Sequence, residues 1–352
     1  MLTWPGASFS FSILTVLSHN LPSSSGNSPT CRRLQNVQAF AFISCCSSLA
    51  MSDVTNSSPS RAEIEFELLL PHQSELSVDP MTPPARTLQQ RGVVRVNQGV
   101  SQEAALQLQK HIDRALETAL EEIAAFRVPR AFRFANVLEK QNRWDLLLPF
   151  EPNQEESHAV MRVLDELLGP GRPIGSVFEE CLGPNAILYE LACLISDPGS
   201  KRQEIHPDIL ISDDHDDSNN GMPLIACFVS LQQVDATMGP TLYIPDTVTA
   251  MHHTRINNPN LADDMLASIP SVISTLGPGD CSLYDPRVLH AGGANQSDRR
   301  RRLFYVTFLS EAGKDPSHDF NPGSIQPELN MKSMTLAQMR ESLEQWRKGK
   351  YL

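Results

Sequence analysis

The spacing of apolar residues changes from a helical to a strand-like period about halfway along the chain. Over residues 101–126, apolar side chains recur every three or four positions, which predicts an amphipathic helix with Ser101 as its N-cap. The same spacing predicts a second helix over 155–168 and a short third one over 178–182. Short β-type runs bounded by Gly- and Pro-containing turns predict strands at 92–96, 186–195, 224–231, 241–244, 281–284 and 303–309.

Many short strands that follow a run of helices favour one architecture. We expect a mainly β fold with α: a double-stranded β-helix, that is, a jelly-roll or cupin-like barrel, buttressed by N-terminal helices. The domain is predicted to span 91–315, with a helical part at 91–183 and the barrel at 184–315. Residues 316–352 are predicted to form a C-terminal tail, whose amphipathic helix at 335–347 would cap the domain or serve as a dimer contact.

The N-terminal segment, residues 1–52, differs in composition from the rest of the chain. It contains no Asp or Glu, is rich in Ser and carries a pair of arginines, a composition that resembles an organellar transit peptide. Two alternatives stay open: the apolar run at 9–17 as part of a secretory signal, and Met51 as the true start of the protein. The expected location is a plastid or mitochondrion if this segment is a transit peptide, and otherwise the cytoplasm.

Composition and charge exclude several classes of protein. The net charge of −12 and the pI near 5.3 argue against nucleic-acid binding, which depends on clustered Lys and Arg, and the one basic run, Arg299–Arg302, is too short for such a surface. No apolar run reaches the roughly 18 residues of a membrane span. The seven cysteines include no CxxC pair, so neither a disulfide framework nor a thiolate zinc site is indicated.

Residues 53–90 are polar and Pro-containing, which predicts a largely irregular segment with a short strand near 64–70.

One short motif offers metal-binding chemistry. His206 and Asp208 follow the predicted strand at 186–195, and in an extended chain residues two apart point to the same side. A second histidine, His290, lies far downstream, and Arg301 follows it inside the basic run. Two histidines and one carboxylate are the ligand set of non-haem Fe(II) oxygenases, which leaves other positions on the metal open.

Several further motifs agree in order with one family. The chain resembles the phytanoyl-CoA dioxygenase family of Fe(II)- and 2-oxoglutarate-dependent oxygenases over roughly residues 92–309. The resemblance rests on 197–203 leading into His206-Pro207-Asp208, on 238–245, on 279–285 and on 290–297 followed by the arginines. It implies a jelly-roll enzyme that uses Fe(II), 2-oxoglutarate and O₂, with His206, Asp208 and His290 as the iron ligands. The implied reaction is hydroxylation of an unactivated C–H bond in a small molecule, with release of succinate and CO₂.

The resemblance also implies a place for the cosubstrate. Arg301 is expected to bind the distal carboxylate of 2-oxoglutarate because a guanidinium matches a carboxylate in shape and charge. Arg302 is the alternative if the strand register slips by one residue, and the remaining arginines are expected on a solvated face. Gln203 and Tyr284 are expected to line the cofactor pocket, with simple packing as the other reading. The family usually has a small hydroxyl residue two positions after the second His, where this chain has Gly292.

Alternatives remain open for both the ligands and the function. His215 and Asp217 form a second HxD motif, but it lies in an acidic Asn/Gly-rich run that predicts a solvated loop, whereas a metal site needs rigid support. Two rival functions are a metal-binding cupin enzyme that does not use 2-oxoglutarate and a non-catalytic ligand-binding barrel. Substrate specificity is expected to come from the 209–222 loop, the helical N-terminal part and the 246–272 insertion.

Overall fold

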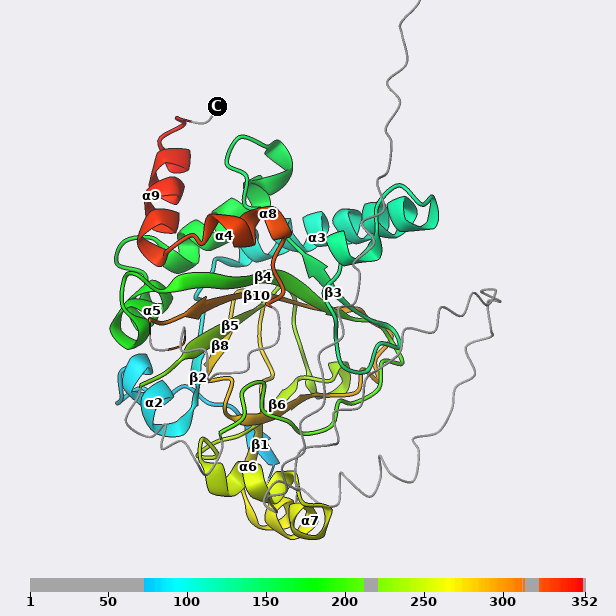
Figure 1. Ribbon diagram of the computed structural model, residues 1–352, viewed down its shortest axis with the longest axis vertical. Coiled ribbons are helices and arrows are strands. Elements are labelled where there is room, and N and C mark those ends of the chain that lie inside the picture. Colours follow the sequence, from blue (N-terminus) through cyan, green and yellow to red (C-terminus); the bar gives the residue numbers. More distant parts are fainter. Residues whose placement is uncertain (1–72, 212–220, 312, 314–322, 351–352) are drawn as a thin grey trace, which may run out of the picture. The chain divides into compact units, whose positions relative to one another are not determined.

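Two facing β-sheets organise the fold (Figure 1). The computed structural model describes residues 73–211, 221–311, 313 and 323–350. The larger sheet is antiparallel throughout and has, in spatial order, β2 (Val93–Val96), β8 (Cys281–Tyr284), β5 (Leu224–Ser230), β10 (Arg301–Leu309), β4 (Ile187–Ser196) and β3 (Arg143–Leu147). The smaller sheet has β1 (Gln73–Glu75), β7 (Ser271–Ile273), β6 (Thr241–Ile244) and β9 (Leu289–Gly292). Within it, only the β1–β7 pair is parallel.

The chain passes between the two sheets in the order of a jelly roll. After β4 in the larger sheet, residues 203–208 run beside β9 in the smaller sheet, where His206 pairs with His290. The chain then returns to the larger sheet as β5, forms β6 and β7 of the smaller sheet, and alternates through β8, β9 and β10. This is a double-stranded β-helix, as the sequence predicts.

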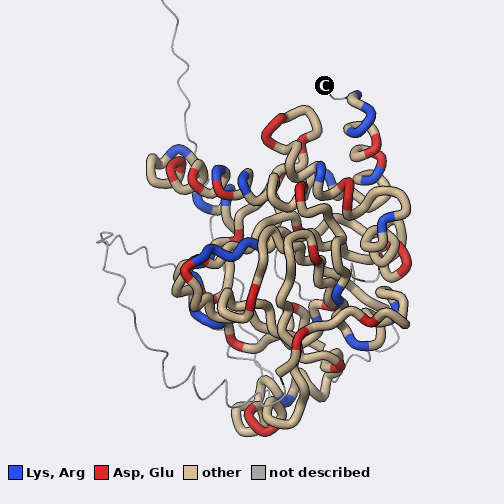
Figure 2. Tube along the Cα trace, turned by 180° about the vertical axis from the view of Figure 1, so that it is seen from behind, with Lys and Arg blue, Asp and Glu red and all other residues tan. Residues whose placement is uncertain are grey.

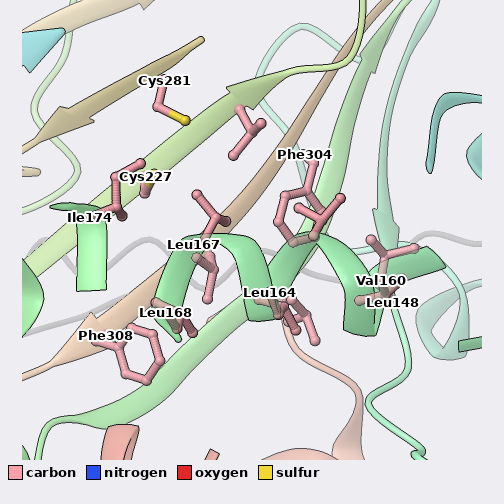
Figure 3. Packing of buried hydrophobic residues seen from close by; sticks show 14 of the residues in the cluster. Leu148, Val160, Leu164, Leu167, Leu168, Ile174, Cys227, Cys281, Phe304 and Phe308 are labelled. Carbon is pink, nitrogen blue, oxygen red and sulfur yellow. The ribbon is translucent and has the colours of Figure 1, made fainter. Parts of the chain in front are cut away.

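Helices cover the outer face of the larger sheet, the face turned away from the smaller one. These helices are α3 (Gln102–Ala124), α4 (His158–Leu168), α5 (Pro173–Leu182) and α9 (Leu336–Arg347). Figure 3 shows Leu164 and Leu168 of α4 close to Phe304 and Phe308 of β10, and all four side chains belong to one buried apolar cluster. The predicted helical buttress and the predicted C-terminal helix are therefore confirmed, and the latter packs on α4.

The remaining helices lie elsewhere. α6 (Ala250–Ile256) and α7 (Pro259–Ser268) occupy the 246–272 insertion, where Met265 and Leu266 pack with Leu242 and Leu289 of the smaller sheet. The other helical segments are α2 (Pro84–Arg91), α8 (Pro327–Lys332), and the short 3₁₀ turns η1 (Arg130–Phe132), η2 (Glu155–Ser157) and η4 (Ala236–Met238). Among the described residues, no helix combines the length and the apolar character needed to cross a membrane.

The inner face of the larger sheet, which is turned toward the smaller sheet, has a different character. Strand alternation sends Phe304, Val306 and Phe308 of β10 outward to the helices, while Leu303 and Tyr305 join an inner cluster with residues of the smaller sheet. This inner cluster is rich in aromatic residues, and polar side chains lie beside it. The inner face is therefore where the candidate site must be sought.

One sequence expectation needs correction, several strands were not expected, and the expectations for 1–52, for a strand near 64–70 and for the second HxD motif lie outside the described residues. The segment 53–90 is not irregular throughout, because β1 and α2 fall within its described part. Strands β3, β7 and β9 were not predicted at all. The expectations for residues 1–52, and the alternative motif of His215 and Asp217, concern residues that the structure does not describe.

Candidate metal centre

Three side chains predicted from the sequence converge between the sheets. Nε2 of His206 lies 3.6 Å from one carboxylate oxygen of Asp208, and Nε2 of His290 lies 3.5 Å from the other. The two imidazole rings are 4.7 Å apart at their centroids. One ligand atom from each residue lies within 4.8 Å of those of the others, which is close enough for one metal ion to contact all three.

The backbone fixes how both histidines present their rings. Nδ1 of His206 lies 2.7 Å from the carbonyl oxygen of Glu204, and Nδ1 of His290 lies 2.9 Å from that of Val288. A carbonyl only accepts, so each Nδ1 carries the hydrogen and each Nε2 keeps its lone pair. Burial lowers the pKa of His290, which also favours its neutral form. Neutral imidazoles with free Nε2 atoms are what a divalent metal requires.

Asp208 is held from one side and open on the other. The hydroxyl of Tyr284 donates to its Oδ2 at 3.2 Å. The side chain of Asp208 is 42% exposed, whereas that of His290 is only 7% exposed. The site thus has one wall buried in the barrel and one side accessible to small molecules. Two nitrogens and one carboxylate on one side fit the facial ligand set of a non-haem iron centre.

Arg301 lies deeper in the barrel, on the inner face of β10. Its side chain is 0% exposed, and Nη2 donates to the hydroxyl of Ser196 at 3.0 Å. Its Nε and Nη1 atoms have no partner within the described residues. Burial, and next the positive charge of Arg143, lower the pKa of Arg301 to about 9. A buried guanidinium with unmatched donors fits an anionic group such as a carboxylate.

Comparisons with known proteins agree with this arrangement. The family model for phytanoyl-CoA dioxygenase (PhyH) matches residues 88–303, which is more than half of the chain. The chain belongs to the phytanoyl-CoA dioxygenase family. It is accordingly a non-haem iron dioxygenase that depends on 2-oxoglutarate, with iron as its cofactor and 2-oxoglutarate as its cosubstrate.

Individual relatives are more distant from this oxygenase. Dioxygenase FrzG of Cladobotryum sp is 33% identical over 121 residues, a match that covers 32% of this chain and only 37% of that relative's length. Among solved structures, the carbocyclase SnoK of nogalamycin biosynthesis has a TM-score of 0.47 at 15% identity and covers 70% of this chain and 89% of its own. AviO1 from Streptomyces viridochromogenes Tue57 has a TM-score of 0.44 at 14% identity, with coverages of 70% and 99%.

The neighbouring arginines of this oxygenase have other partners. Arg302 points to the outer face and donates to both carboxylate oxygens of Asp113 on α3 at 2.8 and 2.9 Å. Arg300 contacts Asp113 and also pairs with Asp197. The expectation of a solvated face is wrong for Arg300 and Arg302, because both contact Asp113 and thereby attach α3 to the sheet.

Gln203, which was expected to line the cofactor pocket, bonds to the backbone. Its Oε1 accepts from the N–H of Gly292 at 2.8 Å, and its Nε2 lies 3.4 Å from the carbonyl oxygen of Leu138. A Cβ atom at position 292 would lie only 2.5 Å from this Oε1. A side chain at 292 would therefore have to displace the carboxamide of Gln203, which fills the space that a hydroxyl side chain there would need.

Several polar residues of the inner face were not singled out from the sequence. Asp145 of β3 accepts hydrogen bonds from the hydroxyls of Tyr305 and Ser324, and Glu190 of β4 accepts one from Thr307. Burial raises the pKa of Asp145 to about 6 and that of Glu190 to about 7. The signal that could have revealed them is a charged residue inside an otherwise apolar strand, which is rare without a partner or a function.

Proposed function

We propose that this oxygenase hydroxylates an unactivated C–H bond of a small molecule at an iron centre held by His206, Asp208 and His290. The observation that carries the proposal is the convergence of two Nε2 atoms and a carboxylate within 4.8 Å at the accessible side of a jelly-roll barrel. When bound, ferrous iron and 2-oxoglutarate supply oxidation by O₂, coupled to conversion of 2-oxoglutarate to succinate and CO₂.

The residues around the centre bind, orient and exclude water. Each histidine is held in one tautomer by a backbone carbonyl, and Asp208 is oriented by Tyr284. Arg301 would bind the distal carboxylate of 2-oxoglutarate with its unmatched donors. On the inner face, the ring of Phe228 lies against those of Tyr284 and Tyr305, at centroid distances of 5.4 and 5.5 Å. They form an apolar wall suited to a small-molecule substrate.

Binding of iron and 2-oxoglutarate tests the proposal directly. The purified protein is titrated without oxygen with Fe(II) and then with 2-oxoglutarate, and the weak visible charge-transfer band of the complex is recorded. The wild type should develop the band, and His206→Ala should not. His252→Ala is the matched control, because His252 lies on α6, bonds locally to Thr249 and should leave the band unchanged.

Product analysis separates this function from its two rivals. A cupin enzyme that does not use 2-oxoglutarate would consume O₂ without forming succinate. A ligand-binding barrel would form no succinate with or without a substrate. Absence of the band in the wild type, together with absence of succinate, would contradict the proposal.

A further inference from the structure

Two buried arginines meet at one serine without a counter-ion. The strand register places Ser196 of β4 opposite Arg143 of β3 on one side and opposite Arg301 of β10 on the other. Both guanidinium side chains are 0% exposed. Across residues 73–211, 221–311, 313 and 323–350, neither forms an ion pair with a carboxylate. Two positive charges buried together without an anion are unfavourable, so this place in the barrel is suited to an anion.

The hydroxyl of Ser196 is the second unusual feature. Nε of Arg143 donates to its oxygen at 3.2 Å, and Nη2 of Arg301 donates to the same oxygen at 3.0 Å. A hydroxyl oxygen has two lone pairs, and both are then occupied. The hydroxyl hydrogen must therefore be donated to a third group, and no acceptor for it lies among the residues described. The two arginines together turn Ser196 into a donor.

The unmatched donors lie on neighbouring residues. Nε and Nη1 of Arg301 have no partner in the described part of the chain, and the hydroxyl hydrogen of Ser196 adds a third donor beside them. A carboxylate offers about four acceptor positions and can take several of these hydrogens at once. A neutral ligand would satisfy the donors but would leave both charges uncompensated.

Arg143 differs from Arg301 because its guanidinium already donates hydrogen bonds to backbone carbonyls. Its Nη2 donates to the carbonyl oxygen of Lys201 at 2.8 Å and lies 3.3 Å from that of Gly293. Lys201 precedes the segment that carries His206, and Gly293 directly follows β9, which carries His290. Arg143 thus holds both segments in place while its Nε fixes Ser196.

We propose that Ser196 and Arg143 complete the binding site for the distal carboxylate of 2-oxoglutarate in this oxygenase. Ser196 donates its hydroxyl hydrogen to that carboxylate beside Arg301. Arg143 is a positioning residue: it fixes the hydroxyl of Ser196 and supplies the second positive charge. The inference rests on the proposed function, which places 2-oxoglutarate in the barrel. Its consequence is selectivity for an oxo acid with two carboxylates over one with a single carboxylate.

The lowered pKa values agree with this assignment. Burial lowers the pKa of Arg143 to about 10, and burial together with the nearby charge of Arg143 lowers that of Arg301 to about 9. Burial is the largest cause of both shifts, and the negative charge of Glu139 offsets only part of it at Arg143. A bound carboxylate would oppose both shifts.

The test compares two oxo acids that differ only at the distal end. The full-length protein loaded with Fe(II) is titrated without oxygen with 2-oxoglutarate and with 2-oxovalerate, which has the same chain length but no distal carboxylate. The variants are Ser196→Ala, Arg143→Lys and the control Arg95→Lys. Arg95 lies on the same sheet, is partly buried and binds Asp280 at 2.8 Å, so it tests for a general effect of altering a paired arginine of this sheet.

Ser196→Ala should raise the Kd for 2-oxoglutarate about tenfold, since one hydrogen bond to a charged group is lost, and should leave that for 2-oxovalerate unchanged. Arg143→Lys should have a similar effect, because an ammonium cannot bridge Ser196 and two carbonyls as the planar fork does. Arg95→Lys should alter neither Kd. In the iron-free protein, glutarate should raise the melting temperature of the wild type more than that of Ser196→Ala.

Three other outcomes would overturn one claim each. If the wild type binds 2-oxoglutarate and Ser196→Ala binds both oxo acids like the wild type, the assignment of Ser196 is wrong, whereas the iron-dependent function stands. Equal weakening of both oxo acids in Arg143→Lys would mean that Arg143 only supports the fold. If the wild type binds no 2-oxoglutarate at all, the proposed function itself fails. Should Arg143→Lys not fold, the small change in Ser196→Ala still decides the question.

Discussion

Replacing Arg301 by methionine should make the ligand-free protein more stable. The pKa of Arg301 is lowered from 12.5 to about 9, and this shift corresponds to roughly 5 kcal/mol against keeping the charge in the folded protein at neutral pH. Methionine has a similar length and no charge, and it leaves no orphaned N–H groups in place of Nε and Nη1. The loss of the hydrogen bond to Ser196 and imperfect packing offset part of the gain.

Replacement of buried ion pairs by apolar side chains of similar volume is often neutral or stabilising by about 1–4 kcal/mol, and a buried charge without a partner should gain at the upper part of this range. For a folded region of this size, such a gain raises the melting temperature by roughly 3–10 °C. The assay is urea denaturation and thermal unfolding of the iron-free protein. The same measurements in the presence of Fe(II) and 2-oxoglutarate show the cost to function. At one hundred times its Kd the cosubstrate should stabilise the wild type by about 2.7 kcal/mol, and it should not stabilise Arg301→Met.

A matched control lies one residue further along the strand. Arg302 points to the outer face and is paired with Asp113 of α3, so Arg302→Met breaks a paired contact and should destabilise the protein with or without cosubstrate. The reasoning about Arg301 would be refuted by an Arg301→Met variant that is less stable than the wild type and is still stabilised by 2-oxoglutarate. That result would mean that Arg301 serves the fold rather than the cosubstrate.

Three further outcomes are expected from other parts of the molecule. Because burial raises the pKa of Asp145 to about 6 and of Glu190 to about 7, the folded state binds protons more tightly than the unfolded chain. The free energy of unfolding should therefore fall as the pH rises from about 4 to 8, by roughly 3 kcal/mol for either group. Urea denaturation at several pH values should show a smaller fall for Asp145→Asn and for Glu190→Gln. Leu343→Ala removes a fully buried side chain of α9 and should cost about 2–5 kcal/mol by the same method. Tyr284→Phe removes the hydrogen bond to Asp208 and should weaken Fe(II) binding about tenfold in an anaerobic titration.

Elements with a strong local signal could be predicted from the sequence. Helix α3 follows the apolar spacing of its residues, and the Ser101 hydroxyl accepts from the N–H of Ala104 as an N-cap should. Strands β4, β5, β6, β8 and β10 coincide with apolar runs that the larger and smaller sheets bury. The candidate metal residues were also within reach, because His206 and Asp208 share one short motif and the second histidine sits at its family position.

Elements that depend on distant partners could not be predicted. Strand β9 has only four residues and one of them is His290, so its own pattern is too short to show a strand. It exists because β6 and the 203–208 segment pair with it on either side. Helix α2 was not predicted for a different reason. Its prolines suggested irregular chain, but Pro84 occupies the first turn of the helix, where a missing N–H costs nothing.

The meeting of Arg143, Ser196 and Arg301 is also invisible in the sequence. Each residue is merely a polar position in a strand, and only the register of β3, β4 and β10 brings the three together. Their separation along the chain spans most of the described fold, so no local spacing encodes the contact. Register is set by which face of each strand is apolar, and that information is spread over the three strands.

The two faces of the larger sheet have opposite effects on stability. Its outer face packs Phe304, Phe308 and the helices into one continuous apolar cluster, and truncation there must destabilise the protein. Its inner face keeps Arg301 without a counter-charge. The same face also carries Glu190, which accepts a hydrogen bond from Thr307, six positions after Arg301 along β10 and therefore roughly 20 Å from it. A buried charge without a partner opposes folding, and such charges cluster at functional sites, which favours a ligand beside Arg301. The opposite signs expected for Leu343→Ala and Arg301→Met therefore distinguish a face that holds the fold together from a face that binds.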